Sequence, residues 1–243
     1  MAENTTIALV TGANRGLGFE VCRQLAQQGM TVLLGARDLD KASAAAQTLA
    51  GEGLRVIGRQ LDVADDASVR ALAAEVERDF GRLDVLVNNA AGYVDWRETA
   101  STADLEAVHA LFETNLFGPW RMAQAFLPLL RKSAHPRLIN VASGAGSHGD
   151  MQFGLTTNGG ATASYGISKA ALNGLTSKLA AELEGTGILV NSVCPGLTAT
   201  APGMEAMGAR PVAEGAASIV WAALLPDDAP SGGFFRDGKP LPW

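Results

Sequence analysis

Cysteine, tyrosine and histidine are scarce in this chain of 243 residues, which has two cysteines, two tyrosines and three histidines. Cys22 and Cys194 stand far apart, so the sequence supports neither a disulfide framework nor a zinc site, which needs clustered ligands. No metal site is expected. Both thiols are expected to be buried and reduced, as is usual in the cytosol, and the chain is predicted to be cytoplasmic.

The chain also lacks long apolar runs and concentrations of positive charge. No stretch reaches the roughly 18 apolar residues of a membrane span, and the N-terminus shows no basic segment followed by an apolar one. Neither a membrane anchor nor a signal peptide is therefore expected. The net charge is -6, and the lysines and arginines are scattered, so nucleic acid is not an expected partner.

Short apolar runs alternate with helical patterns along the whole chain. The expected strands are 6–12, 31–37, 55–63, 83–92, 137–146, 188–196 and 232–238. The expected helices are 19–29, 38–52, 65–81, 164–187 and 212–226, with one long or two shorter helices in 102–132. Apolar strands followed by helices indicate a parallel sheet covered on both faces. The sequence predicts an α/β fold, a single doubly wound Rossmann-type domain over residues 1–243 with about seven strands.

The end of the first strand is rich in glycine, and ligands of such folds bind at the carboxyl ends of the strands. Gly12, Gly16 and Gly18 allow a tight turn and a close approach to a pyrophosphate. The helix that follows offers unpaired N–H groups and a positive dipole end. The spacing differs from the usual GxGxxG fingerprint, and a purely structural turn is the alternative. The place of the turn between strand and helix favours a dinucleotide site.

The end of the second strand indicates which dinucleotide binds. An NAD site places an acid there to accept a hydrogen bond from the ribose 2′-hydroxyl. This strand ends instead in Gly35, Ala36 and Arg37, and Arg15 stands inside the glycine turn. Guanidinium groups pair well with a 2′-phosphate, so NADP is favoured as the cofactor. Two solvated arginines are the alternative, since Asp38 follows directly.

One of the two tyrosines, Tyr165, stands four residues before Lys169 in an expected helix. Residues at this spacing share one face of a helix. A phenol has a pKa of about 10, and a nearby ammonium is expected to lower it toward the range that is useful for proton transfer. Such a pair also occurs by chance on helix surfaces, so alone it indicates little.

Two further side chains strengthen the case for an active site. Ser143 ends the fifth strand, where its hydroxyl can donate to a carbonyl oxygen as negative charge develops. Asn115 stands within a helical segment, although asparagine is a poor helix former. A specific role is expected for Asn115, with a solvent-facing position as the alternative.

In chain order, the motifs TGANRGLG, LDV, NNAAG, TNLFG, Ser143, SYGISK and PGLTAT resemble those of the classical short-chain dehydrogenase/reductase family. The resemblance covers residues 6 to 225. The ARD after the second strand, TNLFG and the C-terminal segment are most similar to the NADPH-dependent carbonyl reductase branch. The resemblance implies that Tyr165 is the general acid and that Lys169 lowers its pKa and binds the nicotinamide ribose. It also implies that Ser143 polarises the substrate carbonyl and that Asn115 positions a water for proton relay.

The resemblance further implies a set of residues that contact NADP, in addition to Tyr165 and Lys169. Asn88 is not one of them, because it is expected to hold the sheet together. The set is Gly12, Asn14, Arg15, Gly16, Leu17 and Gly18 around the phosphates, Arg37 on the 2′-phosphate, Asp62 with Val63 at the adenine, Asn89, Ala90 and Gly92 at the adenosine and ribose, and Pro195, Gly196, Thr198 and Thr200 around the nicotinamide.

Two short segments depart from the family pattern. NNAAG replaces NNAG, which leaves the contacts of Ala91 and Gly92 open. The ending FFRDGKPLPW is also unusual, and Phe235 and Trp243 are expected either at an interface or against their own domain.

The interval between Ser143 and Tyr165 is longer than in most family members. Its segment SHGDMQFGLTTNGG is expected to form a loop, given its glycines and polar residues. Met151 and Phe153 either line a substrate pocket or belong to a plain surface excursion. His148 has no acidic partner or nucleophile in view and is expected to be an ordinary loop residue.

The sequence therefore predicts an NADPH-dependent carbonyl reductase that reduces ketones or aldehydes to alcohols, with a small-molecule carbonyl compound as the substrate and Tyr165 as the proton donor. One alternative is a dedicated metabolic enzyme of the same family, such as a 3-oxoacyl-carrier-protein reductase or a sugar or steroid alcohol dehydrogenase. A non-catalytic NADP-sensing regulator is the alternative of another class, since a fold does not fix a function. A halide-releasing lyase is disfavoured by the dinucleotide turn and by Lys169.

The sequence does not decide the oligomeric state of the protein. The resemblance suggests a homodimer or homotetramer through helices in 102–132 and 164–187. The long loop before Tyr165 can block one such contact, so a monomer is not excluded.

Overall fold

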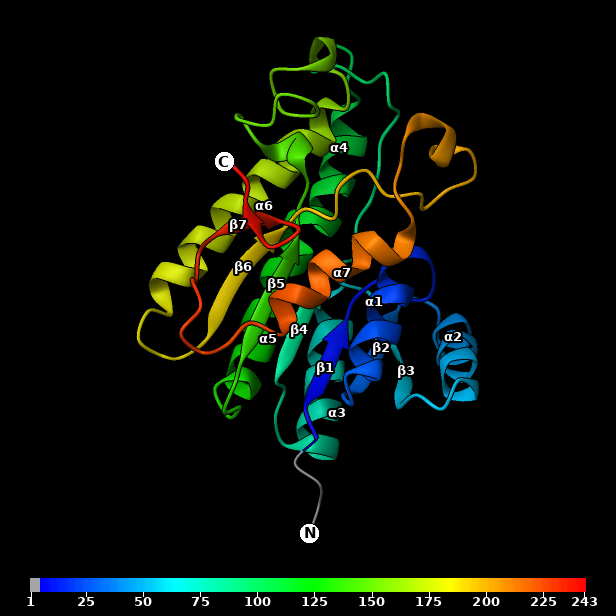
Figure 1. The fold of residues 1–243 in the computed structure, drawn as a ribbon, viewed down its shortest axis with the longest axis vertical. Helices are drawn as coiled ribbons and strands as arrows, with labels where there is room; N and C mark the ends of the chain where they lie inside the picture. Colours follow the sequence, from blue (N-terminus) through cyan, green and yellow to red (C-terminus); the bar gives the residue numbers. More distant parts are fainter. Residues whose placement is uncertain (1–4) are drawn as a thin grey trace.

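A computed structural model describes residues 5–243 of the chain (Figure 1). The strands are β1 Ile7–Val10, β2 Thr31–Ala36, β3 Val56–Gln60, β4 Val85–Asn88, β5 Arg137–Val141, β6 Leu189–Val193, β7 Phe234–Arg236 and β8 Lys239–Pro240. The α-helices are α1 Gly16–Gln27, α2 Leu39–Gly51, α3 Asp66–Phe80, α4 Leu105–Phe112, α5 Gly118–Leu130, α6 Ala163–Glu182 and α7 Val212–Ala223. Shorter turns are the π-helix η1 Glu113–Phe117 and the 3-10 turns η2 Gly144–Gly146, η3 Asn158–Gly160 and η4 Met204–Met207.

All eight strands belong to one sheet with the order β3-β2-β1-β4-β5-β6-β7-β8. Pairs from β3 to β7 are parallel, and only β8 runs antiparallel to its neighbour. The predicted doubly wound α/β fold is confirmed. The short strand β8 was not predicted from the sequence.

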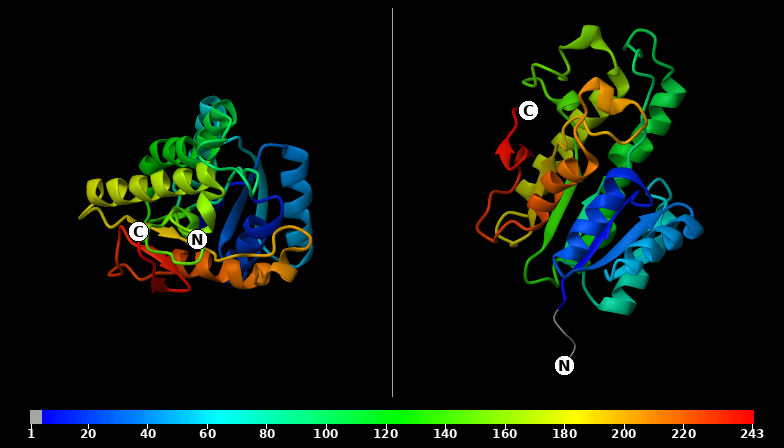
Figure 2. Two further views of the ribbon diagram at one scale, coloured as in Figure 1. Left: turned by 90° about the horizontal axis from the view of Figure 1, so that it is seen from above. Right: turned by 45° about the vertical axis from the view of Figure 1, so that its right-hand side comes forward.

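Two hydrophobic cores lie on opposite faces of the sheet. Ala8 and Val10 of β1 pack with α1, α2 and α7, whereas Leu9 packs with α3, α5 and α6. Figure 2, seen from above, shows α7 on one side of the sheet and α5 and α6 on the other. Because both faces are buried, most strand positions carry apolar side chains, and this produces the apolar runs of the sequence.

Aspartates cap three of the helices that follow the strands. Asp38, Asp65 and Asp104 accept hydrogen bonds from backbone N–H groups in the first turns of α2, α3 and α4. Such caps satisfy N–H groups that have no partner within the helix. Helices α2 and α3 begin one residue after their predicted starts, whereas α4 begins at Leu105, three residues after the start of the predicted helical region 102–132.

The predicted strands are longer than the observed ones at their carboxyl ends. The expected strand 137–146, for example, ends at Val141 and continues as a loop with the 3-10 turn η2. These extensions leave the sheet to form turns over its carboxyl edge. The expected helical region 102–132 is also divided, because a π-helix interrupts it around Asn115.

A buried polar chain crosses the centre of the sheet. Asn88 Nδ2 donates to Asn140 Oδ1 at 2.9 Å, and Asn140 Nδ2 donates to Thr176 Oγ1 at 2.9 Å. Asn88 therefore links β4, β5 and α6, as the sequence predicts.

Strand order reverses between β1 and β4, and in such folds a ligand crevice is expected above the carboxyl ends of the strands at this point. The motifs TGANRGLG, NNAAG and PGLTAT and the residue Ser143 stand at or just after the carboxyl ends of β1, β4, β6 and β5, so they meet at this edge. Over residues 5–243, no helix combines the length and the apolar character that a bilayer span requires. No group of three His, Cys, Asp or Glu side chains suited to a metal ion occurs in the same range.

Candidate active site

Tyr165 and Lys169 lie side by side on the first turns of α6, as their spacing predicts. The Lys169 ammonium is 5.6 Å from the centroid of the Tyr165 ring. Lys169 is only 2% exposed, and its Nζ donates to the Val141 carbonyl at the end of β5 at 2.8 Å. An ammonium has three donors, so two remain for a ligand in the crevice.

Burial shifts the pKa of both groups, in opposite directions. Burial lowers the pKa of Lys169 to about 8, because it penalises the charged ammonium. Burial raises the pKa of Tyr165 above its ordinary value, and the nearby Ser143 hydroxyl only partly opposes this. The predicted lowering of the Tyr165 pKa by Lys169 is therefore wrong for this structure. The phenol stays protonated at neutral pH, which suits a proton donor.

Asn115 is fully buried in the π-helix and faces the active site, so it is not a solvent-facing residue. Its Oδ1 accepts from the Gly92 N–H at 2.7 Å, and its Nδ2 donates to Ser168 Oγ at 3.0 Å. Ser168 directly precedes Lys169 in α6. Asn115 therefore connects the segment after β4 to the helix that carries Tyr165.

Ser143 caps the turn that follows β5. Its backbone is extended, and its Oγ accepts from the Ala145 N–H at 3.2 Å. Its hydroxyl also lies near enough to the Tyr165 phenol to act on the pKa of that phenol, which it tends to lower. The structure thus brings Ser143 and Tyr165 together across the long intervening loop.

The glycine turn fits the pyrophosphate of a dinucleotide. Gly12 has a φ of +63°, and a Cβ there would lie 2.7 Å from the Ala90 Cα, while a Cβ on Gly18 would lie 2.4 Å from Asn89 Nδ2. Helix α1 begins at Gly16 without a side-chain cap and without an acid in its first turn. Its free N–H groups and positive dipole end are thus available to an anion.

The outer end of the crevice fits the 2′-phosphate of NADP. Arg15 and Lys41 line a hollow of about 460 Å³, and Arg37 is exposed directly after β2. The Asp38 carboxylate caps α2 by accepting from the Lys41 N–H at 3.1 Å, so it is already engaged. Its backbone hydrogen bond with Lys41 is the largest influence on the Asp38 pKa, which is lower than usual. The sequence analysis did not predict a cofactor contact for Lys41. Its position in the first turn of α2, shortly after the end of β2, could have indicated one.

Several residues expected at the cofactor have their polar groups engaged within the protein. Asn89 Nδ2 donates to the carbonyls of Thr11 at 2.8 Å and Gly12 at 3.2 Å. Thr198 Oγ1 donates to the carbonyls of Pro195 at 3.1 Å and Gly196 at 3.2 Å. These side chains stabilise the two turns that border the crevice.

The remaining expected residues are spread around the same edge. Asp62 Oδ1 accepts from the Ala64 N–H at 3.0 Å. Val63 and Leu17 pack in the two cores. Thr200 is exposed and faces Gly16, where a Cβ would lie 3.9 Å from the threonine side chain. Asn14 lines the hollow beside Arg15.

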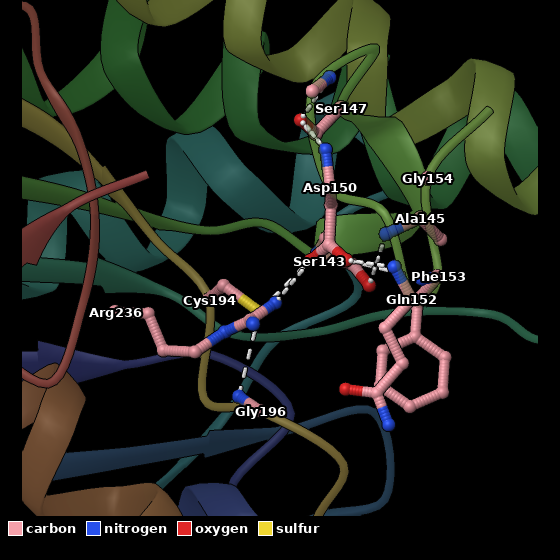
Figure 3. A network of polar contacts seen from close by, with 12 residues as sticks. Ser143, Ala145, Ser147, Asp150, Gln152, Phe153, Gly154, Cys194, Gly196 and Arg236 are labelled. Atoms are coloured by element: carbon pink, nitrogen blue, oxygen red, sulfur yellow. Dashed lines mark hydrogen bonds and ion pairs between the residues drawn. The ribbon is translucent and has the colours of Figure 1, made fainter. Parts of the chain in front are cut away.

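A buried network behind Ser143 was not predicted from the sequence (Figure 3). Cys194 Sγ accepts from the N–H groups of Gly144 at 3.2 Å and Gly196 at 3.4 Å. It also accepts from Arg236 Nη2 at 3.2 Å, and the same nitrogen donates to Asp150 Oδ2 at 2.6 Å. This Cys194–Arg236–Asp150 network joins the turn after Ser143 to the turn after β6. In the sequence, the one feature that could have indicated this network was Arg236 within the last predicted strand, 232–238.

The C-terminal tail packs on its own domain. The Trp243 carbonyl accepts from the N–H groups of His148 at 3.0 Å and Gly149 at 3.2 Å. The Trp243 ring stacks on Phe234 with centroids 5.6 Å apart. His148 is a loop residue, as expected, and Met151 is 86% exposed. The tail thus covers the loop before Tyr165, while Met151 points away from the core.

Replacing Asp150 with asparagine is expected to lower the free energy of unfolding by about 2 kcal/mol at pH 7, since it leaves Arg236 without its charged partner. Burial acts to raise the pKa of Asp150, but the N–H groups of Phe153 and Gln152 and the Arg236 guanidinium outweigh it and hold the pKa below its usual value. The ion pair therefore stabilises the fold above the unfolded-state pKa of about 4 and ceases to do so as the pH falls below that value.

Denaturant titrations of the wild type and Asp150→Asn from pH 7 to pH 3 measure this effect. The difference in stability is expected to shrink below about pH 4. Asp66→Asn, which removes an exposed ion pair with Arg70, is the matched control and should change stability by less than about 1 kcal/mol. A difference for Asp150→Asn that is the same at pH 3 and pH 7 would contradict the assignment.

Comparison with known proteins gives relatives over nearly the whole chain. Residues 6–209 match the family model for short chain dehydrogenases. (+)-Neomenthol dehydrogenase of Arabidopsis thaliana is 36% identical, with 97% of this chain and 97% of the relative covered. Carbonyl reductase (NADPH) 1 of Sus scrofa is 32% identical, with 100% and 96% covered. The crystal structure of NADPH-bound carbonyl reductase from chicken fatty liver has a TM-score of 0.86 at 30% identity, with 98% and 99% covered.

Proposed function

The chain belongs to the short-chain dehydrogenase/reductase family and is an NADP-dependent oxidoreductase, and we propose that it is a carbonyl reductase that converts ketones and aldehydes to alcohols. One observation supports this proposal above the others. The Tyr165 phenol is kept protonated by burial and lies close to the Ser143 hydroxyl at the carboxyl edge of the sheet, close enough for Ser143 to influence its pKa. A protonated phenol beside a second hydroxyl can receive a carbonyl oxygen as negative charge develops on it. In this proposal residues 1–243 act as a single domain.

The proposed reaction adds a hydride to the carbonyl carbon and a proton to the carbonyl oxygen, which yields the alcohol. NADPH, when bound, would supply the hydride and would thereby be oxidised to NADP⁺. The hydroxyls of Ser143 and Tyr165 donate hydrogen bonds to the carbonyl oxygen, and Tyr165 transfers its proton to it. Asn115 fixes α6 against Gly92 and, with a water, returns a proton toward Lys169. The two free donors of Lys169 bind the nicotinamide ribose and complete this relay.

The same proposal assigns the cofactor residues by their place in the crevice. The 2′-phosphate is bound by Arg15, Arg37 and Lys41. The N–H groups at the start of α1 and the glycine turn bind the pyrophosphate. Pro195, Gly196 and Thr200 border the nicotinamide, while Asn89 and Thr198 hold the turns on either side.

An assay of NADPH oxidation by the purified protein tests the proposal. The panel contains aryl and alkyl ketones, aldehydes, diketones and a 3-oxoacyl thioester. Turnover of simple ketones or aldehydes is expected. Turnover restricted to the thioester would favour a carrier-protein reductase instead. Tight NADPH binding without any turnover on the panel would favour the non-catalytic sensor.

The rate of reduction is expected to depend on the charge of Lys169. Because burial lowers the Lys169 pKa to about 8, its ammonium is present below that pH and loses its proton above it. The value of kcat/KM is therefore expected to be level up to about pH 8 and to fall roughly tenfold per pH unit beyond it. The measurement is a pH profile of kcat/KM with NADPH saturating.

Lys169→Arg provides the control for this profile, because a guanidinium stays charged over the whole range. Its maximal rate is expected to be lower, but the fall near pH 8 should disappear. A fall at the same pH in both proteins would show that another group titrates.

A further inference from the structure

The first turn of α6, which carries Tyr165, has no cap from its own sequence. Thr162 occupies the N-cap position, but its side chain makes no capping bond, and its Oγ donates instead to the Ala161 carbonyl at 2.7 Å. Its φ of +55° lies in the left-handed region, which a β-branched residue rarely adopts. The first turn also contains no acidic residue. The unpaired N–H groups of this turn therefore need partners from elsewhere in the fold.

Glu98, in the segment between β4 and α4, supplies these partners. Its Oε2 accepts from Ser164 N at 2.9 Å and from Ser164 Oγ at 2.6 Å. Its backbone carbonyl accepts from the Ala163 N–H at 3.3 Å. The side chain and the main chain of one residue thus hold the first two residues of α6, directly before Tyr165. The negative charge of the carboxylate also matches the positive end of the helix.

The turn that contains Glu98 is itself held by local hydrogen bonds. The Glu98 N–H donates to the Asp95 carbonyl at 3.1 Å, and Asp95 Oδ1 accepts from the Arg97 N–H at 2.8 Å. On the other side, the Thr102 N–H donates to the Thr99 carbonyl at 3.1 Å, and the Thr99 N–H donates to Thr102 Oγ1 at 3.2 Å. Glu98 therefore reaches α6 from a turn of defined conformation.

A second contact ties the next turn of α6 to the segment that follows β4. Asn115 Oδ1 accepts from the Gly92 N–H, and Asn115 Nδ2 donates to Ser168 Oγ. The same Ser168 hydroxyl donates to the Tyr165 carbonyl at 2.7 Å. Tyr165 thus lies between two tethered serines, Ser164 before it and Ser168 after it. Only the second of these tethers has a role in the reaction proposed above.

Proton transfer from Tyr165 depends on where its phenol lies. A proton donor must come within about 2.6–3.2 Å of the oxygen that receives the proton, and a misplacement of about 1 Å can reduce a rate about 100-fold. The backbone of Tyr165 belongs to the first turn of α6, and the ends of helices fray when their N–H groups lack partners. Loss of the Glu98 bonds is therefore expected to let this turn, and the phenol with it, leave the reactive position.

We propose that Glu98 is a positioning residue, which holds the first turn of α6 and thereby keeps the Tyr165 phenol in place for proton transfer. The proposal rests on the carbonyl reductase function proposed above. Glu98 acts through Ser164 and Ala163 and gives no proton itself. It therefore governs the rate of the chemical step. NADPH binding should change little, because the glycine turn and the arginines that face the cofactor lie on other elements.

Steady-state kinetics of Glu98 variants tests this role. Glu98→Ala removes both side-chain bonds and is expected to reduce kcat about 10- to 100-fold, while KM for the ketone changes less than about threefold. Glu98→Gln keeps an oxygen acceptor for Ser164 and is expected to stay within about threefold of the wild-type kcat. Asp104→Ala is the matched control, because it removes the carboxylate cap of the neighbouring helix α4, and it should leave kcat unchanged.

Two results of these assays would overturn the positioning role. The first is a wild-type kcat in Glu98→Ala. The second is a rise in KM without a fall in kcat, because Glu98 would then contact the substrate. If Glu98→Ala does not fold, Ser164→Ala replaces it, since this variant removes only one of the bonds to the carboxylate and is expected to reduce kcat about 3- to 10-fold. A wild-type kcat in Ser164→Ala would then overturn the proposal.

The Tyr165 phenol can also be observed without turnover, because Tyr93 is the only other tyrosine in the chain. Protein labelled with ¹³C at the tyrosine Cζ is expected to give two NMR signals, and the one missing from Tyr93→Phe is that of Tyr93. In Glu98→Ala the Tyr165 signal is expected to shift and broaden, whereas in Glu98→Gln it should stay near its wild-type position.

This measurement separates the positioning role from the proposed function. An unchanged Tyr165 signal in Glu98→Ala would overturn the positioning role, whether or not any ketone is reduced. A wild type that reduces no carbonyl compound, together with the expected change of the signal in Glu98→Ala, would support the positioning of Tyr165 by Glu98 and contradict only the carbonyl reductase function.

Discussion

Replacement of Tyr165 by phenylalanine is expected to reduce kcat for carbonyl reduction by about 10²- to 10⁴-fold, the range of a single general acid. The variant keeps the ring that stacks on Tyr93 and loses only the hydroxyl. Ser143 then remains to bond the carbonyl oxygen, but the proposed proton donor is lost. The measurement is steady-state NADPH oxidation with the best ketone found for the wild type.

Binding and folding controls separate this chemical effect from damage to the site. The dissociation constant of NADPH and the free energy of unfolding should change little, because the Tyr165 ring and the Lys169 contact with Val141 are retained. Ser143→Ala is expected to reduce kcat less, since Tyr165 still gives the proton. A Tyr165→Phe variant with more than about a tenth of wild-type kcat would contradict the role of Tyr165.

Joint replacement of Arg15 and Arg37 by alanine is expected to weaken NADPH binding about 10²- to 10³-fold. Hydrogen bonds to charged groups contribute about 1.5–3 kcal/mol each, which corresponds to roughly a tenfold loss or more for each arginine. The 2′-phosphate is the only part of NADPH that NADH lacks. Binding of NADH should therefore change by less than about threefold.

Fluorescence titration of both dinucleotides measures this change in preference. Lys41→Ala alone is expected to have a smaller effect, because Lys41 is also paired with Asp38 at 3.5 Å. A reciprocal variant, Arg37→Asp, should improve NADH binding by placing an acid at the end of β2. An equal loss of affinity for NADPH and NADH in the double variant would show that the arginines determine the conformation of the turn and do not bind the 2′-phosphate.

Local patterns predict the fold and the core of the site because those features depend on residues close in sequence. The glycine turn needs only a strand before it and a helix after it, and Gly12 makes the expected tight turn with a left-handed backbone, at a φ of +63°. The shared face of Tyr165 and Lys169 follows from helical geometry alone. Such features arise from short-range periodicity, which a single sequence contains.

Features that depend on contacts between distant segments are not predictable in this way. Asp150 and Arg236 form an ion pair, and Glu98 caps α6 at Ser164, yet no local pattern connects these residues. The pKa of Tyr165 illustrates the same limit. Its lysine neighbour is visible in the sequence, whereas the burial that raises the pKa arises only from tertiary packing.

The most direct test of the central claim follows the hydride itself. NADPH carrying deuterium at the reactive carbon of the nicotinamide is incubated with the protein and an aryl ketone, and the alcohol is examined by mass spectrometry and NMR. The account predicts one deuterium on the carbinol carbon, delivered from only one of the two labelled faces, and no alcohol above background with Tyr165→Phe. Tight NADPH binding with no labelled alcohol from any ketone or aldehyde of the panel would contradict it.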